Sequence, residues 1–314
     1  MPDVGHVILR DSTLREGLDV PNVKLFLEER LFLTRVLRKL GLEEAEVLAP
    51  ARVDEDLKYL SVMRQTCSGL RFTGLLYAAS ADLERQSRRT AKCLDRTEIL
   101  VAASPKRKPH GWEEKRSLLM SAIDLVSRDF QHFGAGFPNA TQIAKDELRR
   151  LVDAAIASNV DRITIYDTNG SSDPFKTFRL IESIVKLSDV PVFFHGHNDL
   201  GMATANTLAA VEAGAAGVDV TLLGLGDRAG NCSLEQIAMC LQVRGYETGI
   251  NFGYLNEAAR QVAKLSGMDV GPLSPVVGEY VFSHVSPGHL EDPELFYAFD
   301  PKLVEPVEHL QESE

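Results

Sequence analysis

The sequence predicts a closed (β/α)8 barrel, a TIM barrel, followed by a small helical lid segment. Eight apolar or β-branched runs recur along the chain, and stretches with the periodicity of amphipathic helices lie between them. The runs are too apolar to alternate cleanly between a buried and a solvated face, which is typical of parallel strands covered on both sides. Eight such units favour a closed barrel, and an open doubly wound sheet is the alternative.

Each predicted strand is followed by enough chain for a crossover helix. The strands are VILRDST (7–13), EAEVLAP (44–50), RFTGLLYA (71–78), TEILVAA (97–103), QHFGAG (131–136), RITIYDT (162–168), VPVFFHG (190–196) and GVDVTLLGL (217–225). Helical spacing is clearest over 25–40, 113–129, 144–158 and 202–214. The pattern stops after residue 245, so we expect a catalytic barrel over 1–245. A C-terminal lid subdomain over 246–314 follows, with one amphipathic helix at 256–270.

Composition narrows the classes of function. The 314 residues suffice for one barrel of about 250 residues with an appendage. The chain has 34 Lys and Arg against 45 Asp and Glu, and its net charge of −11 opposes general binding to nucleic acid or anionic membranes. The four cysteines are scattered without a CxxC pair, and we find no signal peptide and no long apolar run. We therefore expect a cytoplasmic protein without a membrane span.

A parallel barrel builds its active site from the carboxyl ends of its strands and the loops that follow them. This rule selects polar residues on one rim: Arg10, Asp11, Arg15, Glu16, Glu46, Ser104, Asn139, Thr141, Asp167, Thr168, His195, His197 and Asn231. His195 and His197 share one face of an extended segment, because side chains two residues apart point to the same side. A bare HxH pair is more often structural than metal-binding, so the pair needs support from the rest of the chain.

Three segments carry a family resemblance. RDSTLREG (10–17), HGHNDLGMATANTLAAVEAGA (195–215) and GLGDRAGNCSLEQ (224–236) resemble signatures of the DRE-TIM metallolyases, which include 2-isopropylmalate synthase, homocitrate synthase and hydroxymethylglutaryl-CoA lyase. The third segment is closer to the synthase pattern GxGERAGNA than to the lyase pattern, where a Cys precedes a longer glycine-rich loop. The resemblance implies Claisen-type condensation of acetyl-CoA with a 2-oxo acid. Hydrolysis of the thioester would then give a 2-hydroxy-2-carboxymethyl acid.

The same resemblance implies a metal site. Glu16, His195 and His197 would hold a divalent ion (Zn²⁺, Mn²⁺ or Mg²⁺) and leave positions open for a chelating oxo acid. Asp11 is a further candidate, for contact with the metal or, the favoured role, for orienting the arginine four residues later. Asn231 resembles the family asparagine near the metal, and capping of its own loop is the alternative.

Substrate contacts are implied as well. Arg15 would stabilise the oxyanions of the condensation, because a guanidinium is always charged, and a salt bridge at the rim is the alternative. Thr168 would hydrogen-bond the substrate carboxylate or cap its strand. Glu46 resembles a carboxylate that lines the same mouth, where we expect a catalytic group. Asn139 and Ser104 are predicted to contact substrate.

The stretch PVVGEYVFSHVSPGHLEDPELFYAFDP (275–301) resembles the lid of the synthases, in which VGENAF precedes a histidine-containing run. His289 matches the catalytic histidine of that lid, and Tyr297 is a looser match to its tyrosine. In the family these groups assist proton transfer, commonly in the active site of the partner subunit, so the resemblance implies a homodimer. A surface histidine and a packed aromatic are the alternative roles.

The sequence departs from the synthase pattern at three places. Leu18 and Asp19 stand where the condensing enzymes place an acidic or polar residue and then Gln. Pro138 and Asn139 replace the acidic pair after strand five. The chain ends at Glu314 without the long C-terminal regulatory domain, so feedback inhibition is not expected. These changes predict an altered 2-oxo acid, whose identity the sequence leaves open together with the metal and the direction of reaction.

Two other functions remain open. One is a lyase or aldolase of the same superfamily that cleaves a hydroxy acid or hydroxyacyl-CoA, and the other is a non-catalytic metal-binding barrel. The basic stretch 104–116, which contains Lys106, Arg107, Lys108 and His110, would either meet the phosphates of coenzyme A or form a solvated loop.

Overall fold

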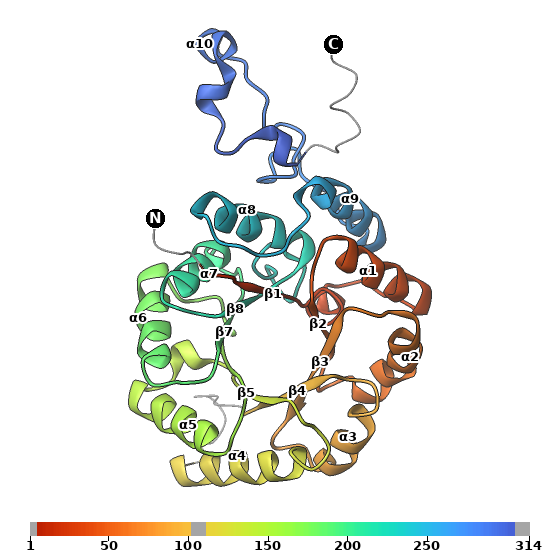
Figure 1. The fold of residues 1–314 in the computed structure, drawn as a ribbon, viewed down its shortest axis with the longest axis vertical. Coiled ribbons are helices and arrows are strands. Elements are labelled where there is room, and N and C mark those ends of the chain that lie inside the picture. The colour runs from red at the N-terminus through yellow and green to blue at the C-terminus, as the bar shows by residue number, and fades with distance from the viewer. Residues whose placement is uncertain (1–4, 102–110, 305–314) are drawn as a thin grey trace.

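Eight parallel strands close into a barrel in sequence order, with β8 pairing back to β1. The computed structural model describes residues 5–101 and 111–304. Figure 1 looks into the barrel and shows the ring of strands inside a ring of helices. The predicted (β/α)8 barrel is therefore confirmed.

All eight predicted strands are present. They are β1 Ile8–Asp11, β2 Glu44–Leu48, β3 Arg71–Tyr77, β4 Arg96–Leu100, β5 Phe133–Phe137, β6 Ile163–Asp167, β7 Val192–Gly196 and β8 Gly217–Val220. The last strand ends earlier than predicted because Leu222–Gly224 form a 3-10 helix, η3. Within it Leu223 has a left-handed φ of 60°, a conformation incompatible with an extended strand.

Each strand is followed by a helix on the outside of the barrel. These are α1 Leu27–Lys39, α2 Val53–Thr66, α3 Leu83–Thr90, α4 Trp112–Val126, α5 Lys145–Ala157, α6 Pro174–Val185, α7 Ala203–Glu212 and α8 Leu234–Arg244. Local signals set their ends. The α6 helix begins with Asp173 accepting a hydrogen bond from the backbone of Lys176 at 2.9 Å and with proline in its first turn. Gly245 ends α8 in the left-handed region.

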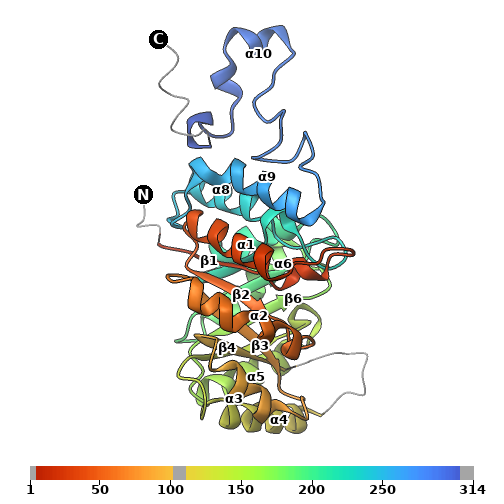
Figure 2. The ribbon, with the colours of Figure 1, turned by 90° about the vertical axis from the view of Figure 1, so that its right-hand side faces the viewer.

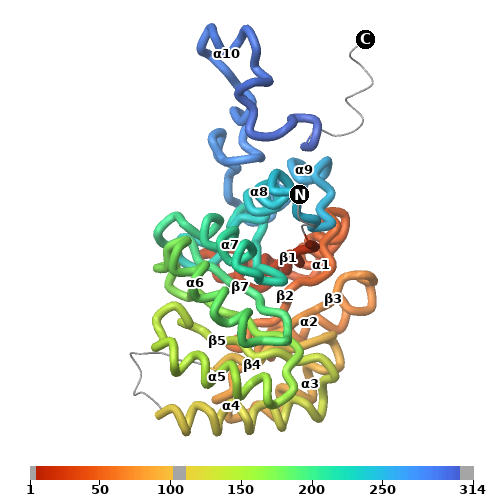
Figure 3. Tube along the Cα trace, turned by 60° about the vertical axis from the view of Figure 1, so that its left-hand side comes forward, coloured from red at the N-terminus to blue at the C-terminus, as the bar shows by residue number. Residues whose placement is uncertain are grey.

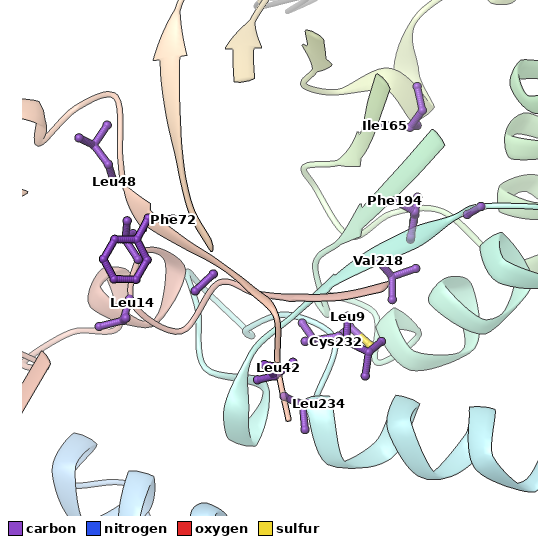
Figure 4. Packing of buried hydrophobic residues seen from close by; sticks show 14 of the residues in the cluster. Leu9, Leu14, Leu42, Leu48, Phe72, Ile165, Phe194, Val218, Cys232 and Leu234 are labelled. Atoms are coloured by element: carbon purple, nitrogen blue, oxygen red, sulfur yellow. The ribbon is translucent and has the colours of Figure 1, made fainter. Parts of the chain in front are cut away.

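Side chains on the strands alternate between the helices and the barrel interior. Outward-pointing residues form the main hydrophobic core, and Figure 4 shows part of it: Leu9, Phe72, Ile165, Phe194 and Val218, from β1, β3, β6, β7 and β8. Burial of such apolar surface between barrel and helices is the dominant stabilising contribution in this fold.

The barrel interior is unusually polar. Five charged side chains point into it and are at most 2% exposed: Arg10, Glu44, Glu46, Glu98 and Asp219. Barrels of this type are more often filled by Val, Ile and Leu. Buried charges are tolerated when they are paired, and Arg10 donates to both Asp219 and Glu98 while Arg162 donates to Glu44. A layer of fixed charge therefore lies beneath the mouth of the barrel.

The C-terminal part leaves the barrel. The helix α9 (Leu255–Ser266) matches the predicted amphipathic helix and contacts α1. An arm follows, with α10 (Pro287–Glu291) and the 3-10 helices η5 (Pro293–Phe296) and η6 (Pro301–Leu303). Figures 2 and 3 show that this arm projects beyond α8 and α9, beside the barrel. The division at residue 245 stays a prediction. In the described ranges, no helix has the length and apolar character needed to cross a membrane.

Candidate active site

Three ligand groups converge at the mouth of the barrel. Glu16 opens the short 3-10 helix η1 (Glu16–Asp19) after β1, while His195 lies in β7 and His197 directly follows that strand. His195 Nε2 lies 3.3 Å from His197 Nε2 and 3.7 Å from Glu16 Oε1. One ligand atom from each residue lies within 4.8 Å of the others. Two imidazole nitrogens and one carboxylate oxygen fit a single divalent cation.

The environment favours the metal-binding protonation states. Burial, followed by the neighbouring His195, lowers the pKa of His197 to about 3, so this imidazole is neutral at pH 7. Burial alone would raise the pKa of Glu16, but Arg15 and the two histidines outweigh it and lower the pKa to about 2. A metal ion binds neutral imidazoles and ionised carboxylates. At neutral pH His197 is a neutral imidazole and Glu16 is an ionised carboxylate, so both are ready to bind an ion.

Asn231 lies beside this triad. Its backbone pairs with that of His197, and its side chain is 4% exposed. Neither polar atom of its amide has a hydrogen-bond partner among the described residues. Leaving such a group unpaired costs about 1–3 kcal/mol, so a bound ion or ligand is a fitting partner. This observation supports the predicted place of Asn231 near the metal.

Asp11 is engaged elsewhere. Its carboxylate accepts hydrogen bonds from the backbone nitrogen and the Oγ1 of Thr13, at 2.9 and 2.8 Å. The strand alternation explains this, because the preceding Arg10 points into the barrel. The expected orientation of Arg15 by Asp11 is not what the structure shows, since the Arg15 guanidinium donates its hydrogen bonds to Glu46 and Glu16. Burial raises the pKa of Asp11 to about 7.

Arg15 is held from below. Its Nε and Nη2 donate to Glu46 Oε2 at 2.8 and 2.6 Å, and its Nη1 donates to Glu16. The same Glu46 oxygen accepts a hydrogen bond from Ser12 Oγ at 2.6 Å. Arg15 lines the cavity at the barrel mouth, whereas Glu46 is fully buried and does not. The catalytic role of Glu46 stays a prediction; in the structure its side chain points into the barrel beneath Arg15 and accepts the hydrogen bonds of that guanidinium.

The cavity has a volume of about 680 Å³ and a polar side around Arg15 and the candidate metal ligands. Thr168 and Asn139 also line it, as predicted for substrate contacts. Thr168 Oγ1 accepts a hydrogen bond from the Asn139 backbone at 2.8 Å, which joins the loops after β5 and β6. Thr141, also predicted on this rim, instead donates to Asp167 at 2.8 Å and stabilises the loop.

An apolar wall faces the polar side. Leu75 from β3, Leu100 from β4 and Tyr166 from β6 line the cavity and form a small cluster of their own. Gly136 from β5 lies between them, and a Cβ there would lie 2.6 Å from Leu100 Cδ2 and 2.9 Å from Tyr166 Cε2. The lack of a side chain at Gly136 therefore makes room for the wall.

Several predicted site residues lie elsewhere. His289 and Tyr297 lie in the C-terminal arm and do not line the cavity. The His289 ring stacks on Phe296 at a centroid distance of 3.8 Å, and its Nδ1 lies 3.3 Å from His284 Nδ1. Arg10, predicted on the rim, is fully buried in the barrel interior instead. Ser104 and the basic stretch of Lys106, Arg107, Lys108 and His110 fall outside the described residues.

Two features of the site were not predicted from the sequence, the apolar wall and Asp219. Asp219 lies in β8, and its Oδ2 lies 2.9 Å from His195 Nδ1. A signal was present, since Asp219 is the single charged residue of the run GVDVTLLGL. A carboxylate inside a buried strand costs free energy unless it is paired, so it marks a polar contact. The wall residues carry no comparable signal, because Leu75, Leu100 and Tyr166 resemble ordinary strand residues.

Comparison with known proteins identifies the family of this chain. The HMGL-like family model matches residues 6–262. The probable 2-isopropylmalate synthase of Methanopyrus kandleri is 34% identical over 296 residues, which cover 92% of this chain and 58% of that protein. Homocitrate synthase 1 of Nostoc sp. is 31% identical over 311 residues, which cover 96% of this chain and 81% of that protein. This chain thus spans little more than half of the first relative and most of the second.

A solved structure shows the likeness of fold. An HMG-CoA lyase from A. baumannii in complex with coenzyme A and 3-methylmalate matches with a TM-score of 0.74, at 18% identity, over 90% of this chain and 98% of that one. The resemblance to the DRE-TIM metallolyases is confirmed by the family model and by the relatives named as synthases. Because the family model covers most of the chain, this protein belongs to the HMGL-like family.

Proposed function

We propose that this protein is a metal-dependent acyltransferase that condenses acetyl-CoA with a 2-oxo acid. The acetyl methyl group loses a proton, its carbon bonds to the ketone carbon, and the ketone oxygen gains a proton to become the hydroxyl. Water then cleaves the thioester to release coenzyme A as a free thiol. The observation that carries the proposal is that Glu16, His195 and His197 open onto the same cavity as Arg15 and Thr168. The sequence relatives named as synthases support the same choice over cleavage.

The chain's own groups divide the work within the cavity. Glu16, His195 and His197 would hold a divalent ion that the oxo acid could chelate, and the ion would supply Lewis acidity to the ketone. Thr168 offers a hydroxyl at the opposite loop, where the acid's carboxylate would be hydrogen-bonded. Arg15 is fixed by two hydrogen bonds to Glu46, so its charge is oriented before an oxyanion develops.

The C-terminal arm supports the further proposal of a homodimer. Its apolar side chains are exposed, with Val285 at 90%, Leu295 at 74% and Leu290 at 61%. The arm lies beside its own barrel, beyond α9, and its residues do not line the cavity (Figure 1). We expect the arm to reach the mouth of a second copy, where His289 and Tyr297 would assist proton transfer.

Complementation tests the shared site. An Arg15→Ala chain and a His289→Ala chain are inactive alone but form one intact site in each mixed dimer if the arm acts in the partner. An equal mixture should then regain about a quarter of wild-type activity, because half of the dimers are mixed and each has one intact site. A mixture as inactive as its components, in material shown to be dimeric by ultracentrifugation, contradicts the shared site.

The reaction is tested with the metal-loaded protein, acetyl-CoA and a panel of 2-oxo acids, by titrating the free thiol and identifying the product by mass spectrometry. We expect thiol release that depends on the acceptor acid. Cleavage of a hydroxy acid or hydroxyacyl-CoA without any condensation would favour the lyase instead. Metal binding without either reaction would favour a non-catalytic barrel.

A further inference from the structure

A second layer of charge lies behind the metal triad. Asp219 Oδ2 is 2.9 Å from His195 Nδ1, on the side of the imidazole opposite to Glu16 and His197. Arg10 holds the same carboxylate with two hydrogen bonds, from Nε to Oδ1 at 2.6 Å and from Nη2 to Oδ2 at 2.9 Å. Arg10, Asp219 and His195 are each at most 2% exposed, so water does not compete for these bonds.

We propose that Asp219, locked by Arg10, is a positioning residue that fixes His195 in the tautomer whose Nε2 binds the metal. The inference rests on the metal site of the proposed function and assigns the residue that prepares it. A carboxylate between a guanidinium and an imidazole accepts hydrogen bonds from both, so His195 Nδ1 carries the proton. A neutral imidazole has a single N–H, which leaves the Nε2 lone pair directed at His197 and Glu16.

The charges also decide on which side of His195 the cation belongs. Glu46, His195 and Asp219 could form an alternative ligand set, since one ligand atom from each also lies within 4.8 Å of the others. Both of its carboxylates are already neutralised by guanidiniums, Asp219 by Arg10 and Glu46 by Arg15, and Arg10 Nη2 lies 3.3 Å from Glu46 as well. A divalent ion there would face two guanidiniums, whereas Glu16 contacts one.

The support is specific to one of the two histidines. His197 Nδ1 is buried and has no hydrogen-bond partner among the described residues. Its tautomer is therefore not set by a carboxylate, while that of His195 is. Removing Asp219 should therefore act on the metal site through His195, because the Nδ1 of His197 has no carboxylate partner among the described residues.

Asparagine cannot replace Asp219 in this arrangement. An amide has one acceptor oxygen and one donor NH2, whereas Asp219 needs acceptors at both positions. If the NH2 occupies the Oδ2 position, it faces Arg10 Nη2 and donates to His195 Nδ1, which forces the proton onto Nε2 and blocks the metal. If the NH2 occupies the Oδ1 position, it faces the N–H of Arg10 Nε, and the hydrogen bond at that position is lost. In either orientation at least one of the contacts that Asp219 makes with Arg10 and His195 is lost.

The first test measures metal affinity. Metal-free wild type, Asp219→Asn and Glu98→Gln are titrated with Zn²⁺ by calorimetry, without acetyl-CoA or oxo acid. Glu98→Gln is the matched control, because Glu98 also accepts a hydrogen bond from Arg10 but does not contact His195. We expect Asp219→Asn to bind Zn²⁺ about 10- to 100-fold more weakly, as for lost outer-sphere partners elsewhere, and Glu98→Gln to bind nearly as wild type. Equal affinities of wild type and Asp219→Asn would overturn the proposal.

The second test reports the tautomer of His195 directly. Nitrogen-15 NMR of histidine-labelled, metal-free wild type reports which ring nitrogen of His195 carries the proton, with the signal assigned by its absence from His195→Gln. We expect the proton on Nδ1 and would abandon the proposal if it resides on Nε2. Failure of the metal site itself is distinguishable, because His195→Gln would then bind Zn²⁺ as tightly as wild type.

Discussion

Replacing Glu46 by Gln tests how the guanidinium of Arg15 is held. Glu46 Oε2 accepts three hydrogen bonds, one from Ser12 and two from Arg15, and its Oε1 lies 3.3 Å from Arg10 Nη2. Glutamine keeps one acceptor oxygen and adds a donor NH2. With its oxygen toward Arg15, the NH2 faces the guanidinium of Arg10, and with the opposite orientation all three donors lose their acceptor.

The size of the effect follows from the remaining partners. Removing one member of a buried ion pair costs about 3–5 kcal/mol because the other charge is left uncompensated. Arg10 retains Asp219 and Glu98, and Arg15 retains Glu16, so neither guanidinium loses every partner. We therefore expect the lower end, a loss of about 3 kcal/mol in the free energy of unfolding. A misdirected Arg15 should also reduce kcat about 10- to 100-fold.

Urea unfolding at pH 7 and thiol release from acetyl-CoA measure the two effects. Glu43→Gln is the control, since Glu43 adjoins the same strand but pairs with Arg71 at the surface, with 67% of its side chain exposed. Exposed pairs contribute about 0–1 kcal/mol, so this variant should behave nearly as wild type. A Glu46→Gln protein that loses less than about 1 kcal/mol and keeps its kcat would refute the positioning role.

Three other perturbations have defined outcomes. Gly136→Ala places a Cβ 2.6 Å from Leu100, so it should lower the free energy of unfolding by about 1–3 kcal/mol in thermal denaturation and raise KM for the oxo acid. If both values are unchanged, the side chains of the apolar wall move aside without cost. Burial raises the pKa of Asp11 to about 7, so its stabilising protonated form is lost as the pH rises from about 4 to 7. Asp11→Asn should therefore gain stability relative to wild type over that range in denaturant titrations, and a pH-independent difference would contradict the shift. Removal of the metal by a chelator should abolish turnover and lower Tm. Restoring the ion at about 100 times its Kd should add about 2.7 kcal/mol to the free energy of unfolding, and a Tm that does not change with the ion argues against the metal site.

The barrel could be predicted because its signal is local. Hydrophobic periodicity depends on residues a few positions apart, and the run 190–196 shows it as clearly in the sequence as β7 does in the structure. The boundary of β8 was wrong for a reason that periodicity does not register. Leu222, Leu223 and Leu225 are apolar, yet the chain turns there through a left-handed residue.

The candidate ligands were predictable because the residue spacing and the family motif point to the same rim of the barrel. His195 and His197 share a face by their spacing, and the rim rule together with the family motif selected Glu16, which the structure brings to 3.7 Å from His195. The catalytic role of Glu46 stays a prediction; the sequence did not reveal that this side chain lies beneath the cavity, because lining the cavity and lying beneath it differ only in side-chain direction and depth. That difference depends on how the closed barrel places β2 against η1.

The sequence by itself determined which segments form strands and helices, their cyclic order and the rim that carries the metal ligands, because these follow from short-range patterns and from the rule that parallel strands end together. Only the tertiary structure decided how the buried charges pair. Arg10 and Asp219 are 209 positions apart in the chain and meet because β1 closes the barrel against β8. It also decided that the arm with His289 lies beside its own barrel, since no local pattern encodes the direction of a segment that leaves the core.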